Sequence, residues 1–336
     1  MNQQKAFSLL AVMLLFWFCK VIAQQTEVPF DTGNKHLLIM HPSIQNLQTM
    51  QFLIDEEIFP LPADYRIIGI GYRHAAYNYE LSEAFIEENN WHHMGMYWVE
   101  DSLSPLELFQ NNSVSHHYRQ LFEHSEGVIF FGGPDIPPLT YGQRTNLLTV
   151  VTDPHRHYFE LSFLFHLLGG FQDVNFDAFL EEKPGYCILG ICLGMQSMNV
   201  ATGGSMIQDI PTQLYGFSTY EEILEAEQNI RHRVYRPYYP TEGNESRAYH
   251  QIRLREAGHM SVINKGLDLS PMVYSAHHQA VDHLGKGFHV TATSMDTRVV
   301  EAIEHRYYPN VIGVQFHPGA RFLYERKEAT DSSFME

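Results

Sequence analysis

The chain has 336 residues, of which 44% are hydrophobic and 18% are charged, which is enough apolar material for one large packed domain or two small ones. The formal net charge of -17 argues against a nucleic-acid partner, because binding a phosphate backbone requires a basic face. The chain also contains 20 histidines, but pairs such as His92-His93 and His116-His117 lack the recurring Cys/His spacing of a zinc site. We therefore expect neither a metal ion nor a cofactor.

Residues 1–23 have the pattern of a secretory signal peptide. Lys5 precedes an apolar stretch from Ala6 to Cys19, and small or branched residues then lead to an expected cleavage after Ala23. The apolar stretch is short for a bilayer span, and an uncleaved anchor is the alternative interpretation. We predict a secreted or periplasmic protein that has no stable membrane insertion once the signal peptide is removed.

Residues 24–326 are predicted to form a single domain, because they contain no internal repeat and no linker rich in Gly, Ser or Pro. The polar stretch Glu221–Ser246, which contains RPYYPTEGNES, is interpreted as part of an insertion at about residues 220–270. Residues 327–336 form a polar tail. The sequence leaves the oligomeric state open.

Eight apolar runs have the length of buried strands. In chain order they are residues 36–41, 66–71, 94–99, 127–131, 186–189, 272–275, 299–303 and 311–316. Between several of these runs lie segments with helical periodicity, at residues 48–58, 113–124 and 156–168. Strands that alternate with helices and are apolar throughout predict an α/β fold, in which a mainly parallel sheet is covered by helices on both faces.

Two cysteines remain after the leader, Cys187 and Cys192, in a compartment that favours disulfides. If Cys187 lies on a strand that runs into a turn, extended chain separates the two residues by roughly 16 Å. A disulfide requires Cα atoms within about 7 Å of each other. We therefore expect no bridge between them, with Cys187 as a core residue and Cys192 as a free thiol.

The pattern Gly190-Ile191-Cys192-Leu193-Gly194, between a predicted strand and a helix-like segment, is the cysteine form of a nucleophile elbow. Glycines on either side let strand and helix approach a side chain that is held on a strained turn. The helix N-terminus is expected to lower the thiol's pKa, and the Leu193 amide to point where an oxyanion would form. A buried structural cysteine in a tight turn is the alternative.

Two further pieces follow strand ends, where ligand sites of α/β proteins gather. The sequence Gly132-Gly133-Pro134-Asp135 follows the apolar run 127–131 and could present a free amide to the same oxyanion, or could form an ordinary turn. His317 directly follows the run 311–316 and is fixed by Pro318, which makes it the candidate base.

Six ordered motifs carry a resemblance to a known family. They are GGPDIPPLTYG (132–142), GICLGMQSMNVATGG (190–204), SMIQDI (205–210), SAHHQAVD (275–282), VVEAIEH (299–305) and GVQFHP (313–318). Together they resemble class I glutamine amidotransferase-like hydrolases, most closely the γ-glutamyl-γ-aminobutyrate hydrolases, which are relatives of the γ-glutamyl hydrolases. The resemblance covers about residues 127–318 and implies a flavodoxin-like sheet.

The resemblance implies catalytic roles for four residues of this chain. Cys192 would be the nucleophile and His317 the base, while the backbone amides of Gly133 and Leu193 would form the oxyanion hole. The expected reaction is cleavage of a γ-glutamyl amide or isopeptide bond of a small molecule, through a γ-glutamyl thioester on the cysteine. The resemblance leaves open the amine portion of that substrate.

The resemblance also implies a set of substrate-binding residues. Gln196, in the sequence CLGMQ, would contact the glutamyl moiety, and the segment that contains Ser275, His277 and His278 would line the pocket. The two histidines have an equally good alternative interpretation as parts of a hydrogen-bonded loop.

The chain departs from the family at the third catalytic position, where the usual His-Pro-Glu is His317-Pro318-Gly319. A catalytic dyad is therefore expected, with Glu301, Glu304 or a backbone carbonyl as candidates to orient the imidazole. Loss of the orienting acid costs about ten-thousandfold in serine triads. A weakened or inactive γ-glutamyl-binding homologue is accordingly one alternative function, and a glutamine amidotransferase subunit is another.

Overall fold

The computed structural model describes residues 30–235, 247–255, 258–264 and 269–325. The predicted signal peptide, the predicted tail and part of the predicted insertion lie outside the described residues. Among the helices of the described part, none is both long and apolar enough to cross a bilayer.

The described residues form a sheet of ten strands in the order β3-β2-β1-β4-β5-β12-β11-β10-β7-β8. The first six strands of that order are mutually parallel: β3 (Met94–Val99), β2 (Tyr65–Tyr72), β1 (Lys35–Met40), β4 (Gly127–Phe130), β5 (Cys187–Ile191) and β12 (Val311–Val314). An antiparallel extension follows, made of β11 (Val300–His305), β10 (Phe288–Ser294), β7 (Ala248–Leu254) and β8 (Met272–Ser275). A separate short pair joins β6 (Met206–Ile207) to β9 (Ala280–Val281).

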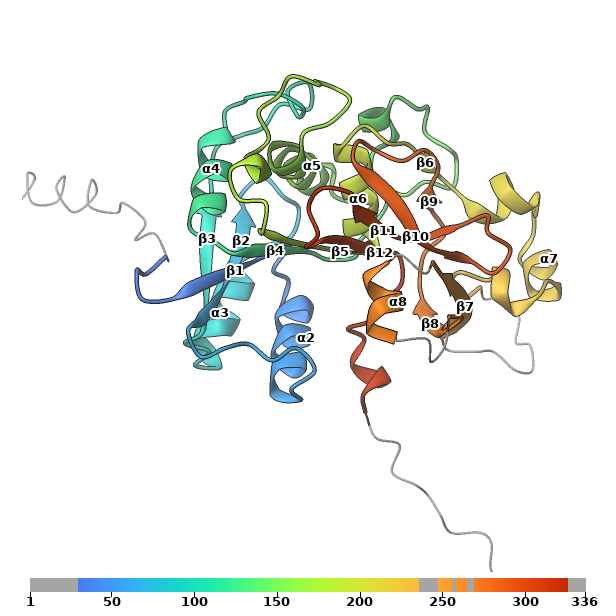
Figure 1. Ribbon diagram of the computed structural model, residues 1–336, viewed down its shortest axis with the longest axis horizontal. Helices are drawn as coiled ribbons and strands as arrows, with labels where there is room; N and C mark the ends of the chain where they lie inside the picture. The colour runs from blue at the N-terminus through green and yellow to red at the C-terminus, as the bar shows by residue number, and fades with distance from the viewer. Residues whose placement is uncertain (1–29, 236–246, 256–257, 265–268, 326–336) are drawn as a thin grey trace, which may run out of the picture.

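Helices lie on both faces of the sheet, as Figure 1 shows. One face carries α4 (Ser115–Glu123), α5 (Pro154–Leu168) and α6 (Leu193–Ala201), and the other carries α2 (Ile44–Asp55) and α3 (Glu80–Glu88). The shorter helices are α7 (Tyr220–Glu225) and α8 (His259–Asn264), and further short helical turns span Pro138–Tyr141, Phe179–Glu181, Pro211–Tyr215, Gln228–Ile230 and Arg321–Leu323. The predicted α/β fold with a mainly parallel, doubly covered sheet is confirmed.

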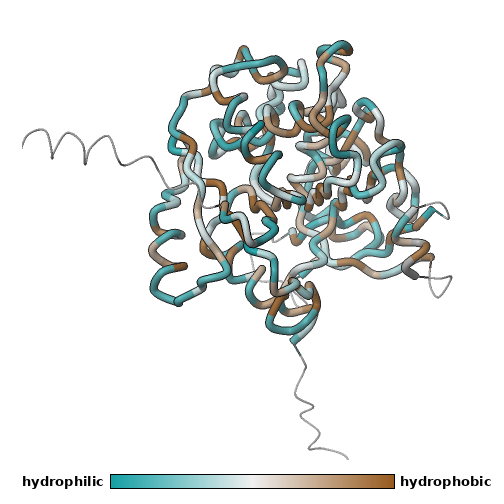
Figure 2. Tube along the Cα trace, turned by 60° about the vertical axis from the view of Figure 1, so that its left-hand side comes forward, coloured by the Kyte–Doolittle hydropathy of each residue, from teal (hydrophilic) through white to brown (hydrophobic). Residues whose placement is uncertain are grey.

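The core consists of two apolar layers, one against each face of the parallel strands. Aromatic side chains of α4 and α5 such as Tyr118 and Phe163 fill one layer, and Leu47 and Met50 of α2 pack in the other. Because the central strands are buried on both faces, their sequences are apolar throughout rather than alternating. Apolar segments accordingly run through the middle of the molecule, with hydrophilic segments on the outer helices and loops (Figure 2).

All eight predicted strands and all three predicted helices are present; β3 and β8 have the predicted boundaries, and the boundaries of the others are shifted. The first helix begins four residues earlier than predicted, at Ile44, because the side chain of Ser43 accepts a hydrogen bond from the Asn46 amide and caps it. The apolar pattern misses β7 and β10, since both contain polar side chains that the sheet buries, among them His250 and Thr293.

Cys187 and Cys192 are both free thiols. The prediction that Cys187 is a core residue is wrong, because it is the first residue of β5 and its side chain is exposed at the amino-terminal edge of the sheet. An apolar run predicts which residues form a strand, but it does not tell that the end of the strand reaches solvent.

Candidate active site

Cys192 lies on a sharp turn between β5 and α6, as the sequence predicts. Its backbone has φ 54° and ψ -105°, a left-handed conformation that is uncommon for residues other than glycine. The glycines on both sides are required by packing: a Cβ at Gly190 would lie 2.7 Å from the Gly194 carbonyl carbon, and one at Gly194 would collide with the Phe130 carbonyl. The strained turn therefore exists because α6 packs directly on the strands.

Burial holds the Cys192 thiol in its protonated form at neutral pH. Its side chain is buried, and burial raises the pKa to about 12, although hydrogen bonds from the Leu193 amide and the Gln315 side chain oppose the rise. The Gln315 Nε2 lies 3.6 Å from the sulfur. The Leu193 amide at the helix N-terminus lowers the pKa of this thiol, as expected, but desolvation of the thiolate outweighs it, so the net shift is upward.

His317 follows β12, and β12 pairs with β5, so that the histidine and the elbow lie at ends of adjacent parallel strands. Both side chains converge on Gly132: a Cβ built there would lie 3.0 Å from His317 Cε1 and 3.6 Å from Cys192 Cβ. The backbone amide of His317 donates to the Tyr274 carbonyl at 3.0 Å, which fixes the histidine's position. Burial lowers the pKa of His317, so the imidazole is a neutral base.

Neither carboxylate that the sequence suggested as an orienting group serves His317. Glu301 contacts His250 at 3.0 Å, and Glu304 contacts His259 at 2.6 Å. Among the described residues, the buried Nε2 of His317 has no hydrogen-bond partner. A side chain at Gly319 would start 3.3 Å from Leu53 of α2, so glycine suits the close approach of this turn to the helix.

The glycine loop, Gly132-Gly133, follows β4 and is hydrogen-bonded to a buried arginine. Arg156 of α5 donates from Nη2 to the carbonyls of Phe131 and Gly132, at 3.3 and 3.1 Å, and pairs with Glu160 at 2.7 Å. In a trans peptide the N–H points opposite to the preceding C=O, so a Gly132 carbonyl that faces Arg156 turns the Gly133 amide away from it. A glycine at position 133 leaves room for this contact, because a Cβ there would lie 2.5 Å from the Arg156 guanidinium and would have to displace it.

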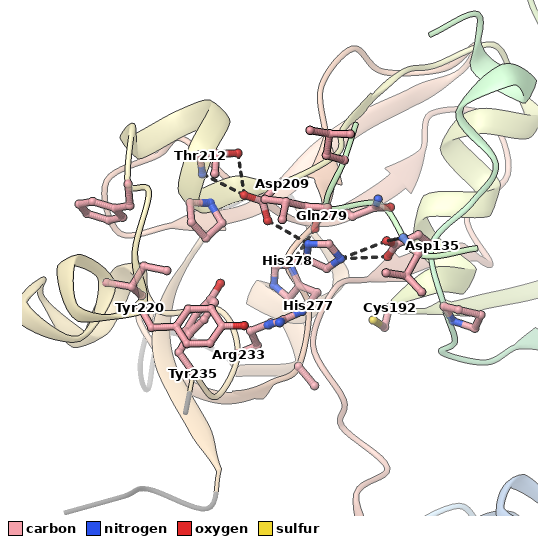
Figure 3. A pocket seen from close by; sticks show the side chains of 18 of the residues that line it. Asp135, Cys192, Asp209, Thr212, Tyr220, Arg233, Tyr235, His277, His278 and Gln279 are labelled. Atoms are coloured by element: carbon pink, nitrogen blue, oxygen red, sulfur yellow. Dashed lines mark hydrogen bonds and ion pairs between the residues drawn. The ribbon is translucent and has the colours of Figure 1, made fainter. Parts of the chain in front are cut away.

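Cys192 lines a cavity of about 570 Å³, shown in Figure 3. Its wall combines the glycine loop, the α6 N-terminus, residues 276–279 and the segment after α7. His317 lines a neighbouring cavity of about 670 Å³, and the two cavities share Gly133, Pro134 and Ala276. Cys192 and His317 thus line two adjoining cavities that meet at the glycine loop.

His278 forms the charged centre of the first cavity, between two carboxylates (Figure 3). Its Nδ1 lies 3.0 Å from Asp209 and its Nε2 lies 3.1 Å from Asp135. Carboxylates only accept hydrogen bonds, so both ring nitrogens must donate and the ring is an imidazolium. Burial opposes this charge, but the two carboxylates prevail and raise the pKa of His278 to about 9.

The other predicted substrate-binding residues occupy different positions. Gln196 and His277 line the cavity, but the Gln196 Nε2 already donates to the Gln279 carbonyl and the Gln315 side chain. Ser275 differs from its predicted place: it is buried, and its hydroxyl donates to the His232 carbonyl at 2.6 Å.

The sequence analysis did not identify three residues of the cavity wall, because they belong to the predicted insertion. Arg233, Tyr220 and Tyr235 line the side of the cavity opposite the glycine loop (Figure 3). Arg233 lies over the Tyr235 ring, 5.2 Å from its centroid. The cluster of basic and aromatic residues at positions 231–239 is the one signal that could have drawn attention to them.

Two groups of side chains in the described part of the chain have an arrangement that could hold a metal ion. Asp101, His116 and His117 are on the surface, whereas His232, His277 and Glu301 are buried. The buried group adjoins the cavity that Cys192 lines, because His277 belongs to both.

The fold and the site together define the class of this protein. A mainly parallel doubly covered sheet, a cysteine elbow after one strand and a histidine after the adjacent strand are features of a class I glutamine amidotransferase-like hydrolase. The model of the family described as Peptidase C26 matches residues 99–319, which is more than half of the chain. The chain belongs to the Peptidase C26 family.

Curated relatives agree with this assignment. A glutamine amidotransferase-like protein of Rickettsia prowazekii is 32% identical over 62% of this chain and 74% of its own length. A glutamine amidotransferase-like protein of Lactococcus lactis is 30% identical over 57% of this chain and 64% of its own length. The γ-glutamyl-γ-aminobutyrate hydrolase of Escherichia coli is 26% identical over 59% of this chain and 66% of its own length.

Among solved structures, a GMP synthase subunit from Thermoplasma acidophilum matches 86% of this chain and 87% of its own length. The identity is 14% and the TM-score is 0.39. The fold class rests on the strand order of this protein rather than on that likeness.

Proposed function

We propose that the protein is an exported cysteine hydrolase that cleaves a γ-glutamyl amide or isopeptide bond. The observation that carries the proposal is the convergence of the Cys192 and His317 side chains on Gly132, at a cavity large enough for a small molecule. The E. coli relative, a γ-glutamyl-γ-aminobutyrate hydrolase by name, supports the substrate class.

The charges in the cavity suit a glutamyl group. The Arg233 guanidinium is a cation that can bind the substrate's α-carboxylate. Both N–H groups of the His278 imidazolium are engaged by Asp135 and Asp209, so His278 contributes positive charge to the cavity rather than a hydrogen bond. Asp135 and Asp209 are anions that can accept hydrogen bonds from the substrate's α-ammonium group. A zwitterionic head held in this way would direct the γ-carbonyl towards Cys192.

The protonation states of the ligand-free site support one order of steps. Because the Cys192 thiol is protonated and the His317 imidazole is neutral, His317 would take the proton as the sulfur attacks the γ-carbonyl carbon. The amides of Gly133 and Leu193 would bind the oxyanion. The imidazolium would then protonate the departing amine, and water would hydrolyse the thioester to free glutamate and restore the thiol.

The decisive test is the substitution Cys192→Ala, with Cys187→Ala as the matched control at the other mature cysteine. We expect release of glutamate from a panel of γ-glutamyl compounds to fall by at least about a thousandfold in Cys192→Ala, because no other nucleophile replaces the sulfur. Cys187→Ala should keep the activity, because its exposed thiol lies at the opposite edge of β5. Undiminished turnover by Cys192→Ala would refute the proposal.

A second candidate is a γ-glutamyl-binding protein with weak or no turnover. It is favoured by one observation, namely that the buried Nε2 of His317 has no partner among the described residues. This candidate predicts ligand binding without glutamate release by the unsubstituted protein. Glutamine in the substrate panel, together with a search for a co-purifying synthase, tests the third candidate, a glutamine amidotransferase component.

Export is part of the proposal and rests on residues 1–23 alone. Expression of the full chain in a secretory host should deliver mature protein that begins at Gln24, and N-terminal sequencing checks this. Retention of residues 1–23 on the isolated protein would favour the uncleaved anchor.

A further inference from the structure

A cluster of three histidines surrounds Glu301 in the interior, next to the cavity that Cys192 lines. Glu301 projects from β11, His250 from β7, and His277 follows β8, while His232 belongs to the segment after the Gln228–Ile230 turn. Each of the four side chains is at most 4% exposed. The proposed hydrolysis uses none of them as a nucleophile, acid or base.

The distances in this cluster are short enough for the side chains to share one ion. The Glu301 Oε1 lies 3.2 Å from His232 Nδ1, 3.0 Å from His250 Nε2 and 3.8 Å from His277 Nε2. In a tetrahedral zinc site with bonds of about 2.0–2.1 Å, neighbouring ligand atoms are roughly 3.4 Å apart. The distances from Glu301 Oε1 to His232 Nδ1 and to His277 Nε2 lie within a few tenths of an ångström of that value.

The hydrogen-bonding pattern leaves lone pairs directed at the carboxylate. His277 Nδ1 donates to the Gln279 carbonyl at 2.9 Å, so the Nε2 of the neutral ring presents its lone pair towards Glu301. A backbone carbonyl that fixes the ring in this way is the usual support of a metal-binding histidine. His232 Nδ1 lies 3.2 Å from Glu301 Oε1, which is close enough for both atoms to share one ion.

Several buried polar atoms of the cluster meet no strict hydrogen-bond geometry with any group in the described part of the chain. They are both ring nitrogens of His232, the His250 Nδ1, the His277 Nε2 and the Glu301 Oε2. Buried polar groups are normally paired, and a bound cation would satisfy these atoms around the carboxylate. The ion-pair partners of Glu301 in the described part are these histidines alone.

We propose that His232, His277 and Glu301 bind one divalent transition-metal ion, of which Zn²⁺ fits the ligand set best. Their ligand atoms lie within 4.8 Å of one another, and a set of two imidazoles and a carboxylate favours zinc over calcium or magnesium. His250 Nε2 donates to the Glu301 carboxylate and orients it. The site escapes sequence analysis because its ligands are separated by 45 and 24 positions, far from the spacing of a zinc motif.

The ion would attach the insertion to the sheet. The His232 carbonyl already accepts hydrogen bonds from the Ser275 hydroxyl at 2.6 Å and the His277 amide at 3.0 Å. A metal bond from the His232 ring adds a third link, which joins this segment to both β8 and β11. Arg233, the next residue, is thereby fixed in the cavity wall.

The test measures metal content, so it is independent of the proposed hydrolase activity. Full-length protein, purified without chelator and with any affinity tag removed, should contain about one zinc per chain by plasma mass spectrometry. His232→Gln should lose the ion, while the matched control His259→Gln should retain it, because His259 contacts Glu304 on the same strand but lies outside the cluster. Stoichiometric zinc in His232→Gln would overturn the proposal.

A second measurement uses the unsubstituted protein, in case the variant does not fold. Chelator-treated protein should unfold at a higher temperature when Zn²⁺ is restored, because an ion that binds only the native state stabilises it. Co²⁺ in its place should give the visible absorption bands of a tetrahedral site. A melting temperature that Zn²⁺ leaves unchanged would show that protons rather than a metal neutralise the cluster, and would also overturn the proposal.

Discussion

At Cys192 two physical effects oppose each other. The strained turn and the Leu193 amide favour an exposed, ionised nucleophile, whereas burial of the side chain keeps the proton on the sulfur. The neutral His317 beside Gly132 is the group that can remove this proton when substrate arrives. A thiol of this kind reacts little with chance electrophiles in the ligand-free protein, because the thiolate is the reactive form.

Alkylation kinetics test this protonation state. With a pKa raised to about 12, the thiolate fraction of Cys192 rises about tenfold for each pH unit between pH 7 and 10. We expect the iodoacetamide rate constant, followed by peptide mass spectrometry, to rise in the same proportion. Cys187 in the same digest serves as the exposed reference. A rate that is constant from pH 7 to 9 would instead indicate a preformed thiolate–imidazolium pair.

At the scale of elements, α5 positions the glycine loop through a buried ion pair. Arg156 and Glu160 are one turn apart on the helix, 4% and 1% exposed, and the arginine also holds the carbonyls of residues 131 and 132. The pair faces the active site from the helix layer. Arg156 has two roles that involve different atoms. Its Nε pairs with Glu160, which affects stability, and its Nη2 donates to the loop carbonyls, which positions the loop.

Substitution of this pair should separate the two roles. Arg156→Met leaves the Glu160 carboxylate buried without a counter-ion and should lower the free energy of unfolding by about 3–5 kcal/mol, measured by urea denaturation. The double variant Arg156→Met/Glu160→Met should recover most of that loss, since a buried apolar pair replaces the ion pair. It should still hydrolyse substrate poorly, because the loop carbonyls lack their donor. Equal stabilities of the single variant and the unsubstituted protein would contradict this account.

At the scale of the whole molecule, the site lies where two kinds of sheet meet. The parallel half supplies Cys192 and the glycine loop, and His317 follows β12, the last parallel strand. The antiparallel extension and the segments connected to it supply the cavity's other wall, including His278 and Arg233. Binding of a ligand between these halves should therefore stabilise the protein as a whole.

The Cys192→Ala variant allows this stabilisation to be measured without turnover. At a γ-glutamyl ligand concentration about 100 times Kd, binding contributes about 2.7 kcal/mol, which should raise the melting temperature by about 4 °C. The double variant Cys192→Ala/Arg233→Gln should show a smaller shift at the same concentration, because it lacks the cation for the α-carboxylate. No shift for Cys192→Ala with any γ-glutamyl compound would argue against both the hydrolase and the binding protein.

Local sequence determined the framework of this site. The apolar runs predicted the parallel strands, and the glycines at 190 and 194 together with the following helical pattern predicted the elbow. The place of His317 at a strand end was likewise evident from the run before it. These features depend on residues close in the chain, so their side-chain types and spacing carry the information.

Only the tertiary structure decided the charges. Whether Cys192 keeps its proton depends on how completely the fold removes it from water. His278 is an imidazolium because Asp135 and Asp209, 143 and 69 positions away in the chain, meet its two nitrogens. The histidines around Glu301 likewise come from separate elements. Burial and long-range electrostatics depend on which distant residues the fold brings together, and no local pattern in the sequence records that.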